Sequence, residues 1–293
     1  MDRHHTGPRF DEKCDIMTGR GISYGAITVI NAMVCGIGCT IGTGLRTEAV
    51  FSDRSDMRIV SILNDPGEDT AMARICVRRA FEYAGVEEPE GWSLTTDSEI
   101  PISRGLKSSS SACNAILSAV FDHLGTDIDS MDLIRLGVSC AREAGVTVTG
   151  SFDDACGCHL GGLVMTDNRA DTVLMSTDID DMDVVIYVPE QKIRKNDLRT
   201  DGLDAISDRV RSLAQSAVSD PLGTMTENGR LFAGVFGVDD SFADRCLSSG
   251  ALAAGMTGAG PAIAVLTERD KGPYVVPTDI RGRIIITRTR HRV

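Results

Sequence analysis

PISRGLKSSSSA, residues 101–112, is the stretch that decides which fold this sequence predicts. Four consecutive serines, Ser108–Ser111, are poor material for a helix interior, because serine hydroxyls compete there for backbone hydrogen bonds. At the start of a helix the first amides lack partners, and hydroxyls can cap them. The preceding residues 91–103 have the pattern of a strand, and the residues from Ser110 have helical spacing that ends at Gly125. The stretch therefore predicts a strand, a loop and a helix in succession.

A loop of this kind is suited to binding phosphate. Backbone amides at a helix N-terminus point outward, and the helix dipole favours an anion. Gly105 permits close approach of the backbone, while Lys107 either adds a positive charge or faces solvent. The stretch is not a P-loop, because the glycines that this motif requires are replaced here by Pro101 and Leu106.

The composition limits the classes of partner. The 293-residue chain has 30 Lys and Arg against 42 Asp and Glu, and this net charge of −12 predicts a surface that repels nucleic acid. The basic residues 288–292 are interpreted as a solvated tail, and the acidic residues 176–183 as a solvated loop. A polar N-terminus and the lack of any apolar run of membrane-spanning length predict a cytoplasmic protein that does not contact a membrane.

The cysteines predict a reducing environment. There are nine, an odd count without paired CxxC spacing, which favours reduced and mostly buried thiols. Cys156, Cys158 and His159 lie close together, but no second pair of ligands accompanies them. We therefore expect packing of small residues there rather than a zinc site.

The remaining periodicity predicts an α+β protein, because strands and helices are mixed without strict alternation. Predicted helices cover residues 26–35, 65–85, 130–145 (with Ser130 as N-cap), 202–218 and 219–236. Predicted strands cover residues 41–52, 183–190, 262–267 and 281–289.

Three further segments are informative beside the serine loop. "GMTGAGPA" (255–262) and "GRGISYGA" (19–26) are glycine-rich, and "GSFDDAC" (150–156) carries two adjacent acids. Taken singly, each is typical of an ordinary turn. Taken together, a phosphate loop, a second glycine loop and a carboxylate indicate phosphoryl transfer to a small molecule.

At this point a family resemblance becomes specific. The stretch 101–112 resembles the ATP-binding motif Pro-x-x-x-Gly-Leu-Gly-Ser-Ser-Ala/Ser of the GHMP kinases, and departs from it at Lys107, where most members have Gly. Residues 255–262 look like the C-terminal glycine-rich motif of that family, and residues 19–26 match its N-terminal motif loosely. "GRGISYGAITVINAMVCGIGCTIG" (19–42) and "AREAGVTVTGSFDDAC" (141–156), with the chain length, resemble the archaeal type of shikimate kinase from about Met17 onward.

The resemblance implies a fold and a reaction. The fold is the two-lobed GHMP kinase fold of the α+β class, with an N-terminal lobe resembling ribosomal protein S5 domain 2 and a ferredoxin-like C-terminal lobe. We expect a polar extension at 1–16, the first lobe at 17–170 and the second at 171–293. The reaction is phosphorylation of the 3-hydroxyl of shikimate by ATP with Mg²⁺, a step towards chorismate.

The resemblance also implies roles for individual residues. Asp153 matches the catalytic aspartate, and it is favoured over Asp154, which is assigned to the metal, the backbone or the substrate. Ser109 matches a serine that contacts magnesium or the β-phosphate, and Glu143 resembles a magnesium ligand. Apart from the resemblance, Arg20, Arg46, Arg104 and Lys107 are candidates for the substrate carboxylate by their proximity to the motifs. The expected ATP-binding residues are Pro101, Ile102, Ser103, Arg104, Gly105, Leu106, Lys107, Ser108, Ser109, Ser110, Ser111, Gly258 and Gly260.

Two alternatives stay open on the sequence. Another GHMP small-molecule kinase, such as homoserine kinase, shares the Arg-Gly-Leu stretch, and residues 146–156 favour shikimate. A ligand-binding GHMP-fold protein without catalysis is the second alternative, and the combination of Asp153, Ser109 and the second glycine loop speaks against it. The sequence does not indicate an oligomeric partner.

Overall fold

The computed structural model describes residues 18–147, 150–190 and 201–293, so the predicted extension at 1–16 lies outside the described residues. The strands are β1 (Gly19–Ile30), β2 (Ile37–Ser52), β3 (Arg58–Ile62), β4 (Trp92–Ser98), β5 (Leu163–Asp167), β6 (Thr172–Thr177), β7 (Met182–Val188), β8 (Ala253–Met256), β9 (Ile263–Glu268) and β10 (Arg283–Arg288). The helices are α1 (Ala71–Ala84), α2 (Ser108–Leu124), α3 (Ser130–Glu143), α4 (Phe152–Leu160), α5 (Leu203–Ser216), α6 (Pro221–Phe236), α7 (Ser241–Ser248) and α8 (Gly272–Val275). This mixture confirms the α+β class.

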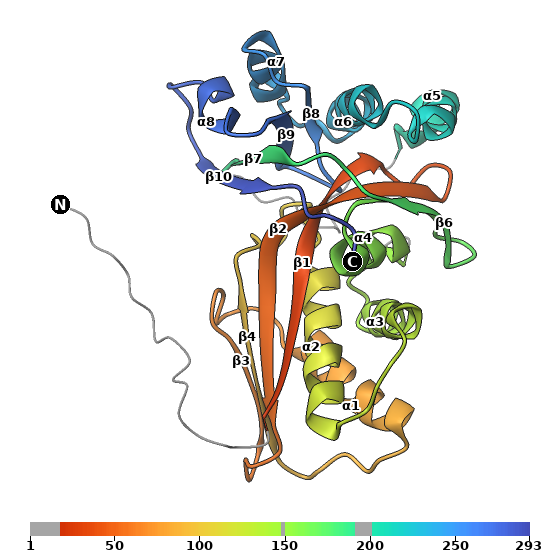
Figure 1. Cartoon of the computed structure of the whole chain (residues 1–293), viewed down its shortest axis with the longest axis vertical. Coiled ribbons are helices and arrows are strands. Elements are labelled where there is room, and N and C mark those ends of the chain that lie inside the picture. The colour runs from red at the N-terminus through yellow and green to blue at the C-terminus, as the bar shows by residue number, and fades with distance from the viewer. Residues whose placement is uncertain (1–17, 148–149, 191–200) are drawn as a thin grey trace, which may run out of the picture.

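The first layer is a six-stranded sheet in the order β3-β4-β2-β5-β6, with β1 paired to β2. The long strand β2 is the central strand of this sheet, because it pairs antiparallel with β1, β4 and β5 along different parts of its length. Figure 1 shows α1, α2, α3 and α4 together on one side of this sheet.

The N-terminal glycine-rich segment is part of this sheet, so the helix predicted over 26–35 is wrong. Residues 27–30 are the β-branched run Ile-Thr-Val-Ile, which is buried and favours a strand. Gly21 lies directly under α2, since a Cβ there would come within 2.0 Å of the Ala115 carbonyl oxygen. The small residues that suggested a helix or a tight turn instead let α2 lie against β1.

The second layer is a four-stranded antiparallel sheet in the order β10-β7-β9-β8. Helices α6, α7 and α8 pack against its strands, and Figure 1 shows α5–α8 at the end of the molecule that holds this sheet. One apolar cluster joins the two layers, because Ile27 and Ile41 of the first sheet share it with Val184 and Leu266 of the second. The layers therefore meet through a continuous core.

Two segments cross between the layers. β6 follows the proposed boundary at residue 170, yet it pairs with β5 in the first sheet. After β10 the chain returns to the first layer, where the Arg290 amide donates to the Gly42 carbonyl (2.9 Å) and the Gly162 amide donates to the Arg290 carbonyl (2.8 Å). The interpretation of 288–292 as a solvated tail is therefore wrong, and the division into lobes at 17–170 and 171–293 stays a proposal.

Most other predicted elements are confirmed, with local differences. The strand predicted over 41–52 begins earlier, and the sequence did not predict β3, β6, β8, α7 or α8. The N-cap of α3 is Asp129, whose side chain accepts from the Met131 amide, rather than Ser130. Asp183, expected in a solvated loop, is 4 % exposed and accepts from the Gly272 amide. Among the described residues, no helix is both long and apolar enough to cross a membrane.

Candidate active site

The turn from β4 into α2 presents backbone amides to a cavity. Ser103, Gly105 and Lys107 all have left-handed backbone conformations, with φ of 58°, 79° and 67°. A Cβ at Gly105 would lie 2.1 Å from the Thr257 carbonyl oxygen, so a side chain does not fit there. Lys107 is the N-cap of α2, and the helix has no side-chain cap, so the predicted capping by serine hydroxyls is not observed. The first amides of α2 therefore stay available to a bound anion.

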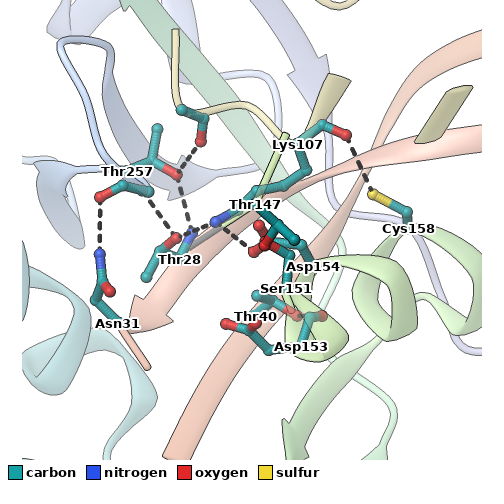
Figure 2. Close-up of polar contacts among 12 residues, drawn as sticks. Thr28, Asn31, Thr40, Lys107, Thr147, Ser151, Asp153, Asp154, Cys158 and Thr257 are labelled. Atoms are coloured by element: carbon teal, nitrogen blue, oxygen red, sulfur yellow. Dashed lines mark hydrogen bonds and ion pairs between the residues drawn. The ribbon is translucent and has the colours of Figure 1, made fainter. Parts of the chain in front are cut away.

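The second glycine loop lies against the first. The Thr257 hydroxyl donates to the Gly105 carbonyl (3.2 Å), and the Thr28 amide donates to the Thr257 hydroxyl (3.0 Å). The Gly258 amide donates to the Thr28 hydroxyl (2.9 Å), and the Asn31 side-chain amide donates to the Gly258 carbonyl (2.8 Å). Figure 2 shows these contacts as a chain from β1 through both loops. The two glycine loops and the end of β1 are thus held as one unit.

Both acids of the "GSFDDAC" segment lie in the first turn of α4 rather than in a loop. Asp153 is 4 % exposed, and its carboxylate accepts a 2.6 Å hydrogen bond from the Asn168 side chain. It packs against Gly38 of β2, where a Cβ would meet the Asp153 carboxylate oxygen at 2.4 Å. Burial, followed by repulsion from Asp154, raises the pKa of Asp153 to about 6. The Asp153 side chain is therefore engaged by the protein itself.

Asp154 faces the phosphate loop. Its carboxylate lies 2.7 Å from the Lys107 ammonium, and that ammonium also donates to the Thr28 hydroxyl at 2.7 Å. Figure 2 shows Asp154 beside the end of the Lys107 side chain, with Asp153 lying toward Thr40 instead. Burial alone would lower the pKa of Lys107, but the carboxylates of Asp154 and Asp153 outweigh it and the pKa is raised. Lys107 is therefore a charged ammonium inside the site rather than a solvated side chain.

A cavity of about 550 Å³ connects these groups. Among the described residues that line it, Lys107 is the one basic side chain. The residues predicted from the sequence that line this cavity are Ile102, Ser103, Gly105, Lys107, Ser108, Ser109, Ser110, Asp153, Asp154, Gly258 and Gly260. This cavity is therefore shared by the N-terminus of α2, the two glycine loops and the two acids.

A second cavity of about 530 Å³ lies on the other side of the loop. Pro101, Ile102 and Arg104 line it together with residues from β4, β7 and the segment before β10. Arg104 donates to the Glu190 carbonyl at 3.2 Å. Since Ile102 lines both cavities, the loop separates two adjoining spaces.

Four predicted site residues lie elsewhere. The Arg20 amide bonds the Asp122 carboxylate near the C-terminal end of α2, which is the end remote from the loop. Glu143 forms an exposed ion pair with Arg78 and does not line the cavity. Leu106 is part of the apolar core, and the Ser111 hydroxyl, fully buried, donates to Thr47. Arg20 and Glu143 therefore do not lie at the cavity, and Leu106 and Ser111, which were expected to bind ATP, are buried in the protein interior instead.

Sequence reasoning missed several residues of the cavity. Thr28 lies within a strand of β-branched residues and Asn31 follows it, so neither had a recognisable motif. Thr147 and Ser151 have hydroxyls 2.6 Å apart; Thr147 precedes the acidic segment that was singled out, and Ser151 belongs to it but was not assigned a role. The remaining polar additions are Glu68 and Asp69, which precede α1. The position of these two acids directly before a predicted helix was the one feature of the sequence that could have indicated them as residues of the cavity.

Comparison with known sequences gives one consistent family. A sequence profile described as GHMP kinases N terminal domain matches residues 71–162. A protein of Methanothrix thermoacetophila named Shikimate kinase is 37% identical over 281 residues, covering 94% of this chain and 95% of its own. A protein of Methanosarcina mazei with the same name is 36% identical over 258 residues, covering 87% of each.

Comparison with solved structures identifies the fold. The mevalonate kinase of Methanococcus jannaschii superposes with a TM-score of 0.77 at 16% identity, covering 92% of this chain and 98% of its own. The homoserine kinase of Cytophaga hutchinsonii superposes with a TM-score of 0.72 at 17% identity, covering 97% and 98%. At such identities the likeness concerns the fold alone, and it confirms the predicted architecture.

Proposed function

Since this chain belongs to the shikimate kinase family, within the GHMP kinases, we propose that it transfers the γ-phosphoryl group of ATP to the 3-hydroxyl of shikimate. The single observation that carries the proposal is the position of the Lys107–Asp154 pair. It lies at the N-terminus of α2, where the amides can bind phosphate, and in the same cavity as Ser109.

The two adjoining cavities support a direction for the nucleotide. The cavity that contains the α2 N-terminus and the acids suits the phosphates and the acceptor hydroxyl, because donors and carboxylates converge there. The neighbouring cavity, reached across Ile102, would take the nucleoside. We propose that ATP lies over the loop at 101–107, with its γ-phosphate nearest Lys107.

The geometry favours Asp154 over Asp153 as the group that receives the acceptor proton. A general base needs to come within hydrogen-bond reach of the hydroxyl that it deprotonates. The Asp154 side chain is 20% exposed and points at the phosphate loop, while the Asp153 carboxylate is held by Asn168 against Gly38. Lys107 then orients Asp154 and places a positive charge beside the transferring group.

The cavity also fits a magnesium ion. Magnesium usually takes one or two carboxylates, with substrate phosphates and water completing its octahedron. Ser109 is the proposed magnesium ligand, and the carboxylates of Glu68, Asp69 and Asp154 line the same cavity. When bound, the ion would neutralise the charge of the phosphates.

Release of ADP with Mg-ATP and a panel of acceptors tests the proposal. Shikimate, homoserine, mevalonate and galactose are compared with a reaction that has no acceptor. We expect turnover with shikimate alone. Turnover with homoserine instead would retain the kinase and refute the substrate, and ATP binding without turnover for any acceptor would favour the non-catalytic alternative.

Two neutral variants separate the acids. Asp154→Asn is expected to reduce kcat by roughly 10²-fold or more, in the range that general acid–base catalysis contributes, while ADP binding persists. Asp153→Asn is its matched control, since an amide at 153 can still accept the Asn168 hydrogen bond. If Asp153→Asn abolishes turnover and Asp154→Asn does not, the assignment is reversed.

A further inference from the structure

We infer that Arg290, in the returning segment 289–293, is a positioning residue that fixes helix α4 and thereby the acidic pair at its other end. The inference rests on the proposed catalytic use of Asp154. It assigns a role to a residue of the basic segment 288–292, which was interpreted from the sequence as a solvated tail.

The end of α4 opposite the acids needs hydrogen-bond partners. A helix leaves its last four carbonyls without intrahelical partners, and in α4 these belong to residues 157–160. The Gly161 amide donates to the Gly157 carbonyl at 3.2 Å. The other three carbonyls accept from the returning segment.

Arg290 supplies two of these bonds with one side chain. Its Nη2 donates to the Cys158 carbonyl at 3.0 Å and to the His159 carbonyl at 2.8 Å. The Val293 amide donates to the Leu160 carbonyl at 2.9 Å. A positively charged donor is favoured at this end, because the helix dipole places partial negative charge there.

The returning segment is itself held firmly. The Arg290 amide and carbonyl bond Gly42 and Gly162, and Thr289 forms a bridge with Thr43 of β2. The Arg290 guanidinium lies over the Tyr24 ring of β1, 4.3 Å from its centroid. Figure 1 shows the C-terminal end of the chain beside α4. The anchor therefore connects α4 to the two strands that carry the site.

The length of α4 makes such an anchor important. Nine residues form a helix of about 14 Å, shorter than a helix that is stable by itself in water. At its N-terminal end, the Thr40 hydroxyl donates to the Asp153 carbonyl at 3.2 Å. With both ends held, the distance between Asp154 and Lys107 is fixed, and loss of one anchor lets the acids shift.

The test compares Arg290→Leu with Arg292→Leu. Arg292 lies in the same segment, carries the same charge and is exposed. We expect Arg290→Leu to lower kcat by roughly 10- to 100-fold, the range for a displacement of about 1 Å in the site, with ADP affinity nearly unchanged. Arg292→Leu is expected to behave as the wild type. Arg290→Lys, which restores a charged donor, is expected to recover part of the lost kcat.

Hydrogen exchange gives a readout that is independent of turnover. In Arg290→Leu the amides of α4 should exchange faster than in the wild type, while those of α2 do not change. Unchanged α4 exchange, or faster exchange with wild-type kcat, would overturn the inference. If Arg290→Leu does not fold, Arg290→Lys and Arg290→Gln are compared with the wild type. Equal kcat and equal α4 exchange rates in all three proteins would overturn the inference. If the wild type shows no turnover with any acceptor, the proposed function fails, and the exchange rates of the α4 amides alone test whether Arg290 holds α4.

Discussion

The ion pair between Lys107 and Asp154 gives the sharpest quantitative prediction. The two charged atoms are 2.7 Å apart, and the Lys107 and Asp154 side chains are 5% and 20% exposed. At an effective dielectric constant of about 20, two unit charges at this distance attract by about 6 kcal/mol, which desolvation largely offsets. Removal of one partner from a buried pair costs about 3–5 kcal/mol, because the other charge is left uncompensated.

We expect the lower end of that range, because Asp154 retains some contact with solvent. Lys107→Met and Asp154→Asn should each lower the free energy of unfolding by about 3 kcal/mol, or Tm by roughly 5 °C for a chain of this size. The double variant should lose about as much as one single variant. The coupling energy is then about 3 kcal/mol, at the upper end of the range for residues in contact.

Urea unfolding followed by the fluorescence of Trp92 measures this cycle. Trp92 is the single tryptophan of the chain, is 1% exposed and lies on β4, the strand that leads into the phosphate loop. The matched control is the exposed pair of Arg78 and Glu143, for which Arg78→Met and Glu143→Gln should couple by less than about 1 kcal/mol. A Lys107–Asp154 coupling no larger than that of the control would refute the buried pair.

Three further predictions concern the same site. Gly105→Ala should weaken ADP binding, measured by calorimetry, by more than about 10-fold. The new Cβ would collide with the Thr257 carbonyl oxygen at 2.1 Å, and the φ of 79° at this position disfavours a side chain. Unchanged ADP affinity would contradict the close approach of the two loops. Glu143→Gln should leave kcat and the magnesium titration within about 2-fold of the wild type, as for a surface ion pair, and a loss of magnesium affinity would restore Glu143 as a ligand. Folding raises the pKa of Asp153 from 3.8 to about 6, so the folded state binds the extra proton and wild-type stability falls as the pH rises through this window. Asp153→Asn has no carboxyl group at this position and lacks this loss. In urea unfolding its free energy of unfolding should rise by on the order of 3 kcal/mol relative to that of the wild type between pH 4 and pH 7. A difference in unfolding free energy that does not change with pH would contradict the raised pKa of Asp153.

The parts of the site that were predictable are those with local patterns. The serine run, the helix that ends at Gly125 and the glycines at 105, 258 and 260 follow from rules about helix starts and left-handed backbone. The acids were recognised as a pair, but their directions depend on the helical phase of α4. That phase turns Asp153 toward Asn168 and Asp154 toward Lys107, and no pattern along the chain reports it.

The errors come from contacts between distant segments. The stretch at 26–35 looks helical by composition, and it is a strand because β2 pairs with it and α2 covers it. The basic tail looks solvated, but Arg290 and Val293 are held in place because they donate hydrogen bonds to the three free carbonyls at the end of α4. Lys107 departs from the family motif, and its partner Asp154 lies 47 positions further along the chain. Each of these depends on tertiary packing rather than on local propensity.

The most direct test of the central claim is the identity of the reaction product. The protein is incubated with Mg-ATP and shikimate, and ³¹P and ¹H NMR spectra locate the new phosphate ester by its coupling to a ring proton. The proposed function predicts one phosphorylated product, with the phosphate on the 3-hydroxyl, and its loss in Asp154→Asn. A phosphate on another hydroxyl, or ADP formation without any phosphorylated shikimate, would contradict it.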